Sequence, residues 1–180
     1  MAGEALPSVT LVLGGARSGK SAYAEGLVTG AVERGVYVAT AREGEDAEMR
    51  ERIAAHRRRR SGFAWRVVEA PLDLSDAVGS LSGSECPVLV DCLSLWLANL
   101  MEAGRDPVAE GERLLAAARG CSAGVVFVSL EVGLGVVPVS FAGRAFRDRL
   151  GVLNCSFAAE ANQVFFVMAG LPARIKPGSA

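Results

Sequence analysis

Histidine and lysine are scarce in this chain of 180 residues, which has one histidine and two lysines against seventeen arginines. A single histidine excludes any site that needs several imidazoles, and the four cysteines form no C-x-x-C pair, so no zinc site is expected. Widely spaced cysteines fit reduced thiols in a cytoplasmic protein. A charge excess is also missing, because the net charge is −1, which gives no general attraction to nucleic acid or to anionic membranes.

Linkers, internal repeats and low-complexity tracts are absent from the sequence as well. With 51% hydrophobic and 22% charged residues, the composition is that of a globular protein. We expect one domain over residues 9–176, with an extension over 1–8 that lacks the basic segment of a signal peptide and a tail over 177–180. Residues 124–143 carry a single charge, but their glycines and Pro138 favour a buried strand and a shaped loop over a membrane span.

Short β-branched runs alternate with helical patterns along the whole chain. The runs are apolar without alternation, which is typical of strands buried on both faces, and strand–helix alternation favours a parallel sheet. The sequence therefore predicts an α/β domain whose mostly parallel sheet carries helices on both faces. The expected strands are 9–13, 36–40, 65–69, 87–91, 125–130 and 163–168, and the expected helices are 20–33, 45–60, 72–81, 94–102, 108–118 and 141–161.

The residues after the first expected strand read Gly-Gly-Ala-Arg-Ser-Gly-Lys-Ser and match the P-loop pattern G-x-x-x-x-G-K-[ST]. Glycines let backbone N–H groups converge on phosphate oxygens, and the next helix adds its positive end. Lys20 is predicted to reach the β- and γ-phosphates, and Ser21 to ligate Mg²⁺. The pattern predicts a single P-loop (RecA-like or kinase-like) domain that binds a nucleoside triphosphate through Gly14, Gly15, Ala16, Arg17, Ser18, Gly19, Lys20 and Ser21.

Three carboxylates end or directly follow expected strands and belong to the same edge of the sheet. Asp91 is predicted to hold Mg²⁺ beside the P-loop, although such a residue can also cap a helix. Glu69 could accept hydrogen bonds from a base or a ribose, and Glu131 opens a glycine-rich loop. Any of the three could take a proton from a substrate hydroxyl. Further on, Arg144 and Asp148 are spaced to pair with each other, or either Arg144 or Arg147 could contact phosphate.

The one histidine, His56, falls on the same helical face as Met49 and Ile53, and four arginines follow it at 57–60. Neighbouring guanidinium groups favour a neutral, nucleophilic imidazole and can stabilise charge on a polyphosphate. A lone histidine and a run of arginines also occur on ordinary solvated faces. These residues alone therefore leave a catalytic role open.

Taken in order, these motifs resemble the bifunctional adenosylcobinamide kinase / adenosylcobinamide-phosphate guanylyltransferase family. The resemblance covers nearly the whole chain and rests on the P-loop and on segments 37–40, 48–56, 69–74, 90–93, 131–138 and 144–148. Two departures are Leu130, where many relatives carry an asparagine, and Cys155, where a glutamine is common.

The resemblance implies phosphorylation of adenosylcobinamide by ATP or GTP, then transfer of GMP from GTP with release of pyrophosphate. His56 would carry GMP as a phosphoramidate, and Ser21 and Asp91 would hold Mg²⁺. Relatives form homo-oligomers, so we expect a second copy of the chain as partner, with no nucleic acid and no membrane span. Beyond the P-loop, the implied nucleotide contacts are Thr40, Ala41, Arg42, Arg59, Arg60, Ser61, Gly62, Glu69 and Asp91.

Three alternatives stay open. The chain could be another small-molecule P-loop kinase without a covalent intermediate, in which His56 has no role. It could be a guanylyltransferase without kinase activity, or a nucleotide-binding module without turnover. A covalent nucleotide would separate the first from the implied function, and release of pyrophosphate from GTP would exclude the last.

Overall fold

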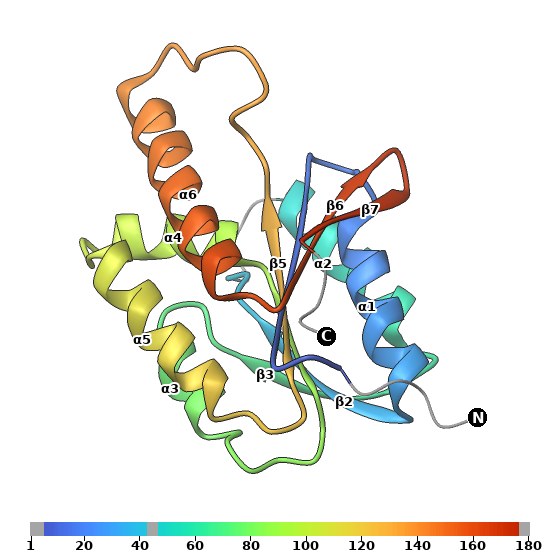
Figure 1. Cartoon of the computed structure of the whole chain (residues 1–180). Coiled ribbons are helices and arrows are strands. Elements are labelled where there is room, and N and C mark those ends of the chain that lie inside the picture. Colours follow the sequence, from blue (N-terminus) through green and yellow to red (C-terminus); the bar gives the residue numbers. More distant parts are fainter. Residues whose placement is uncertain (1–5, 43–46, 177–180) are drawn as a thin grey trace.

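A computed structural model describes residues 6–42 and 47–176, apart from the side chains at 47–49, 52, 53, 56 and 59. The described residues form seven strands and six helices that alternate along most of the chain (Figure 1). In chain order they are β1 (Val9–Gly14), α1 (Lys20–Ala31), β2 (Arg34–Ala39), α2 (Ala47–Arg60), β3 (Ala64–Glu69), α3 (Leu74–Gly79), β4 (Val88–Asp91), α4 (Leu93–Glu102), α5 (Pro107–Arg119), β5 (Val125–Leu130), α6 (Phe141–Glu160), β6 (Gln163–Met168) and β7 (Leu171–Lys176).

The strands form one sheet in the order β3-β2-β4-β5-β1-β6-β7. Neighbouring strands are parallel except for β6 and β7, which are antiparallel. Because parallel strands need crossover connections, the chain returns through helices that lie on the faces of the sheet. The carboxyl ends of β1, β2, β4 and β5 meet at one edge, which is where ligands bind in open α/β sheets.

Helices cover both faces of this sheet (Figure 1). On one face, Trp96 of α4, Leu114 of α5 and Phe157 of α6 are fully buried, and the Phe157 ring meets Phe127 of β5 at 4.9 Å. On the other face, α1 packs Val28 into a second buried cluster. The central strands read as unbroken apolar runs because they are buried from both sides. The predicted α/β fold, with helices on both faces of a mostly parallel sheet, is confirmed.

All twelve predicted elements are present, and their described ends lie within two residues of the expected positions. The expected start of the second helix, at residue 45, lies outside the described residues. Residues 125–130 form β5 and residues 131–140 a following loop, as expected, and α6 begins at Phe141. In the described part of the chain, each helix is too short or too polar to cross a membrane.

The two edges of the sheet differ from the prediction. β7 was not predicted, because its side chains are mostly exposed and it contains Pro172, so neither an apolar run nor an alternation marks it. Proline is tolerated there because an edge strand has a side without ladder hydrogen bonds. β3, at the other edge, is also largely exposed. The expectation that the predicted strands are buried on both faces is therefore wrong for β3.

Candidate active site

The P-loop leaves β1 at Gly14 and ends where α1 begins, at Lys20. A Cβ atom at position 14 would lie 2.5 Å from the carbonyl oxygen of Val167, so only glycine fits there. Gly19 has a φ of 93°, in the left-handed region that glycine adopts without strain. Lys20 Nζ donates to the Gly15 carbonyl at 3.2 Å, which folds this side chain back along the loop. The loop is thus curled at the positive end of α1, as an anion site requires.

The turn between β6 and β7 supports the P-loop. The N–H of Gly170 donates to the Ser18 carbonyl at 2.9 Å, and a Cβ on Gly19 would lie 3.3 Å from the Gly170 Cα. Ser18 is buried, whereas Ala16 and Arg17 at the tip of the loop are exposed. No sequence motif marks this contact, because it joins residues from opposite ends of the chain.

Asp91 ends β4 and lies beside the first turn of α1. Ser21 Oγ donates to Asp91 Oδ1 at 3.3 Å, and Tyr37 Oη of β2 donates to Asp91 Oδ2 at 2.8 Å. A carboxylate and a hydroxyl next to a phosphate-binding loop are the hard oxygen donors that Mg²⁺ takes in nucleotide sites. The two residues predicted to hold Mg²⁺ therefore lie together, and their donor atoms fit the ion.

Tyr37 belongs to this site, although no motif pointed to it as a site residue. Its phenol is buried, and burial together with the negative charge of Asp91 raises the Tyr37 pKa well above its usual value. The hydroxyl therefore stays protonated and donates to the carboxylate. Ala39 of β2 pairs with Asp91 of β4, and Tyr37 lies two residues earlier on the same face. Only the order of the strands in the sheet shows that Tyr37 lies next to Asp91.

The C-terminal end of α2 reaches Tyr37. The guanidinium carbon of Arg60 lies 3.5 Å from the centre of the Tyr37 ring. Arg57 lies 3.6 Å from Glu69 of β3, but both of these side chains are more than half exposed, so this ion pair contributes little stability. The Arg60 contact is the stronger anchor because it is made against a buried ring. It holds the end of α2 on the face of the sheet that α1 covers.

His56 and Arg59 belong to α2, but their side chains lie outside the described residues. His56 lies four residues, about one turn, before the end of the helix at Arg60. Ser61 and Gly62 follow at the surface, and Ser61 Oγ donates to the Arg58 carbonyl at 2.8 Å. The backbone thus carries His56 on the helix whose last residue contacts Tyr37.

The turn after β2 is bound to neighbouring elements. Thr40 is fully buried, and its Oγ1 both donates to the Cys92 carbonyl and accepts from the Cys92 N–H, each at 2.8 Å. Arg42 forms an ion pair with Glu102 of α4 at 2.8 Å, and Ala41 is half-buried. Because the Thr40 hydroxyl is bonded within the protein, a nucleotide contact at this turn would be left to Ala41 and Arg42.

We expect Thr40→Val to destabilise the fold by about 1–3 kcal/mol, because it leaves the buried N–H of Cys92 without an acceptor. The free energy of unfolding in urea measures the loss. Thr29→Val is the matched control, since Thr29 is exposed on α1. Equal stability of the two variants would contradict the structural role of Thr40.

The loop after β5 starts against the P-loop. The N–H of Glu131 donates to the Gly14 carbonyl at 3.1 Å, and its carboxylate accepts from the N–H of Gly133. At the other end of the loop, the Arg144 guanidinium donates to the Pro138 carbonyl at 3.2 Å. Arg144 thus holds the loop against α6.

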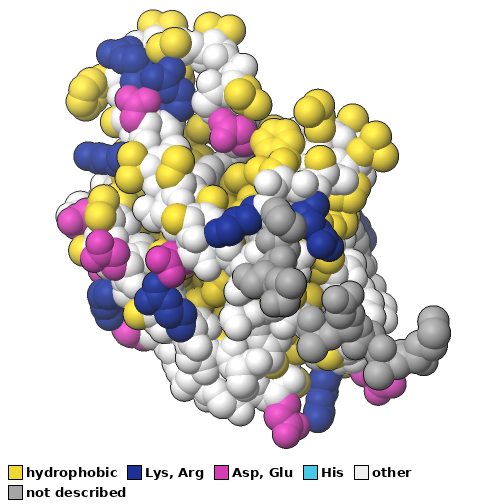
Figure 2. All heavy atoms as spheres, in the orientation of Figure 1, with side chains coloured by type: hydrophobic (Ala, Val, Ile, Leu, Met, Phe, Trp, Pro, Cys, Tyr) yellow, Lys and Arg dark blue, Asp and Glu magenta, His cyan; other side chains and the backbone are white. Residues whose placement is uncertain are grey.

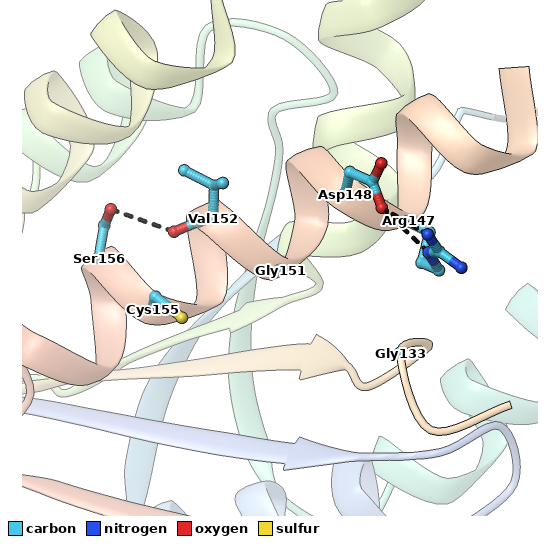
Figure 3. A pocket seen from close by; sticks show the side chains of 7 residues that line it. All are labelled: Gly133, Arg147, Asp148, Gly151, Val152, Cys155 and Ser156. Carbon is cyan, nitrogen blue, oxygen red and sulfur yellow. Dashed lines mark hydrogen bonds and ion pairs between the residues drawn. The ribbon is translucent and has the colours of Figure 1, made fainter. Parts of the chain in front are cut away.

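A shallow hollow of about 570 Å³ lies along α6, opposite the loop residue Gly133 (Figure 3). In it, Asp148 pairs with Arg147 at 2.9 Å rather than with Arg144. Cys155, which departs from the residue common in the resembled family, is exposed there. The other departing residue, Leu130, has its carbonyl bonded to the side-chain amide of Asn154 of α6 at 2.9 Å. The hollow contains none of the predicted nucleotide contacts. Its lining residues are Gly133, Arg147, Asp148, Gly151, Val152, Cys155 and Ser156.

Solved structures share the fold at low sequence identity. The flagellar accessory protein FlaH from Methanocaldococcus jannaschii has a TM-score of 0.56 at 12% identity, over 94% of this chain and 78% of that one. An ATPase from the type III secretion system of pathogenic bacteria also has a TM-score of 0.56, at 11% identity, over 92% of this chain and 57% of that one. These likenesses concern the fold alone.

Sequence comparisons are more specific. A family model described as cobinamide kinase / cobinamide phosphate guanyltransferase matches residues 10–175. The bifunctional adenosylcobalamin biosynthesis protein CobP of Pseudomonas aeruginosa is 43% identical over 171 residues, which cover 92% of this chain and 96% of the relative. The protein CobU of Escherichia coli, with the same description, is 38% identical over 181 residues, covering 92% and 98%. With the motifs, the fold and these matches spanning nearly its whole length, the chain belongs to the cobinamide kinase / cobinamide phosphate guanyltransferase family.

Proposed function

We propose that the chain phosphorylates adenosylcobinamide with a nucleoside triphosphate and then transfers GMP from GTP to the new phosphate, through a guanylyl intermediate on His56. The observation that carries this proposal is that Asp91, at the carboxyl end of β4, is bonded to Ser21 beside the P-loop and to Tyr37, whose ring is contacted by Arg60 of α2. In this proposal one nucleotide site is formed by the phosphate-binding loop, a carboxylate suited to metal and the helix that carries the single histidine.

In the first reaction, the P-loop N–H groups and Lys20 bind the phosphates of the donor. Ser21 and Asp91 would hold Mg²⁺, which when bound neutralises charge on the transferred phosphoryl group. The substrate hydroxyl attacks the γ-phosphorus, and the bond to the leaving nucleoside diphosphate breaks. Because Asp91 already accepts hydrogen bonds from two hydroxyls, Glu69 and Glu131 are the carboxylates to test as acceptors of the substrate proton.

In the second reaction, the neutral imidazole of His56 attacks the α-phosphorus of GTP. A P–N bond forms while the bond to pyrophosphate breaks, and this divides a difficult displacement into two easier ones. The phosphate of adenosylcobinamide-phosphate then attacks the same phosphorus, releases His56 and yields adenosylcobinamide-GDP. Charge on the departing pyrophosphate would be stabilised by arginines of α2. The proposed contacts to the nucleotide in this region are Ala41, Arg42, Arg59, Arg60, Ser61, Gly62 and Glu69, with Thr40 supporting the turn.

The test is to incubate the protein with Mg²⁺ and GTP carrying radioactive phosphorus at either the α or the γ position, and to separate the protein on a denaturing gel. We expect a label from the α position alone, labile to acid and stable to alkali, because a phosphoramidate has that stability. Absence of this label in folded protein that binds GTP would favour the plain kinase. Parallel transfer assays with γ-labelled ATP and GTP would identify the phosphate donor.

We further propose that the chain works as a homo-oligomer in the cytoplasm, without nucleic acid. Hydrophobic side chains gather at one rim of the molecule, over the loop after β5 and the β6–β7 hairpin (Figure 2). Leu134, Val136, Val139 and Phe141 are each at least 80% exposed. Exposed apolar groups of this kind favour a protein contact. Sedimentation analysis should detect a dimer or larger species, and a monomer at micromolar concentration would contradict this part of the proposal.

A further inference from the structure

Hydroxyl groups from two different elements hold the Asp91 carboxylate. Ser21 of α1 donates to one oxygen at 3.3 Å, and Tyr37 of β2 donates to the other at 2.8 Å. Ser21 is itself a proposed Mg²⁺ ligand, so its bond to Asp91 must adjust when the ion binds. Tyr37 is not a proposed metal ligand. Its shorter bond comes from the neighbouring strand and can persist throughout the reaction.

The position of the Tyr37 ring is itself fixed by its neighbours. The residue is 3% exposed, and the Trp65 ring of β3 meets it edge-on, with ring centres 5.8 Å apart. Arg60 lies over the ring at 3.5 Å. A ring enclosed in this way cannot turn its hydroxyl away from the carboxylate without disturbing both contacts.

We infer that Tyr37 is a positioning residue, which fixes the orientation of the Asp91 carboxylate toward the metal–nucleotide complex and connects it to Arg60 at the end of α2. This inference rests on the proposed metal-binding function of Asp91 and extends it. The connection runs from Ser21 through Asp91 and Tyr37 to Arg60, so it joins the P-loop helix α1 to the helix that carries His56.

Tyr37→Phe removes the hydroxyl and keeps the ring, so the Arg60 contact is preserved. A hydrogen bond to a charged group corresponds to roughly a tenfold to hundredfold change in an equilibrium constant. A metal ion can still bind an unsupported carboxylate, so we expect the lower end of this range. The affinity for a divalent ion in the nucleotide complex should fall about tenfold.

Mn²⁺ is the probe, with free ion measured by electron paramagnetic resonance in the presence of a saturating GTP analogue that cannot be cleaved between the β- and γ-phosphates. All proteins also carry His56→Ala, so that no guanylyl transfer takes place. The matched control is Tyr23→Phe, because Tyr23 is the only other tyrosine and packs edge-on against Phe165 at 5.1 Å. This control should change the Mn²⁺ affinity by less than about twofold.

Arg60→Met tests the connection to α2. If Arg60 acts through Tyr37, this substitution should weaken Mn²⁺ binding about threefold in the presence of the hydroxyl and have no effect once Tyr37→Phe has removed it. An equal effect in both backgrounds would mean that Arg60 acts on the nucleotide independently, and would overturn the connection.

Unchanged Mn²⁺ affinity in Tyr37→Phe, in a protein that unfolds at the same urea concentration as its parent, would overturn the positioning role. Failure of the proposed function is a separate result. If the protein with Tyr37 intact binds the nucleotide but no Mn²⁺, the metal site at Asp91 is wrong and the inference falls with it.

Discussion

His56→Ala should abolish covalent labelling of the protein by GTP labelled at the α-phosphorus, with a loss of at least about 10³-fold. No other imidazole can replace the nucleophile, because the chain contains one histidine. Phosphate transfer from the γ position should continue, since the proposed kinase step uses the P-loop, Ser21 and Asp91 and makes no use of His56. The two activities are measured on the same preparation, by gel autoradiography and by formation of phosphorylated adenosylcobinamide.

The control for helix integrity is Glu51→Ala, which alters an exposed residue on the same helix, α2. This variant should keep the covalent label. A label that survives His56→Ala would show that another residue carries the nucleotide, and loss of both activities would show that the substitution disturbs the nucleotide site as a whole.

Lys20→Met should lower the rate of phosphate transfer by about 10²–10³-fold, the range observed when one preorganised donor to a developing charge is removed. Lys20 begins α1 and folds back along the P-loop through its bond to the Gly15 carbonyl at 3.2 Å. Its ammonium group therefore lies where the β- and γ-phosphates are expected. Methionine keeps an unbranched side chain as far as Cε and removes the ammonium group. Steady-state transfer from labelled nucleoside triphosphate measures the effect.

Lys176→Met is the matched control, because Lys176 is the only other lysine and donates to carbonyls at the end of α6, Ala158 at 2.9 Å and Ala159 at 2.8 Å. It should leave the transfer rate unchanged. Full kinase activity in Lys20→Met would contradict the assignment of the P-loop as the donor site. The guanylyl label is also measured in Lys20→Met. If the label falls by the same factor as phosphate transfer, one pocket serves both reactions.

Much of the fold and part of the site were predictable from local patterns. The P-loop could be located because its chemistry needs a fixed set of residue types within eight positions, and Gly14 and Gly19 meet steric demands that no other residue meets. The central strands could be located because burial on both faces produces apolar runs such as that of β5. Edge strand β7 has no such burial, so no pattern marked it.

The pairing of Ser21 with Asp91 could be expected from the sequence, because both residues follow strands that end at one edge of a parallel sheet. The other contacts depend on long-range order. Tyr37 reaches Asp91 because β2 and β4 are neighbours in the sheet although α2, β3 and α3 separate them in the chain. For the same reason Thr40 is bonded to Cys92, and Gly170 supports Ser18.

Residue type and short-range spacing thus specify the α/β class, the phosphate-binding loop and the family, since these depend on periodicity and on chemistry within a short window. Strand order and packing decide which side chains bond to the Asp91 carboxylate and which hydroxyl is bonded inside the protein. They also decide which ring Arg60 of α2 contacts. Those contacts join residues distant in the chain, and their geometry exists only once the sheet has formed.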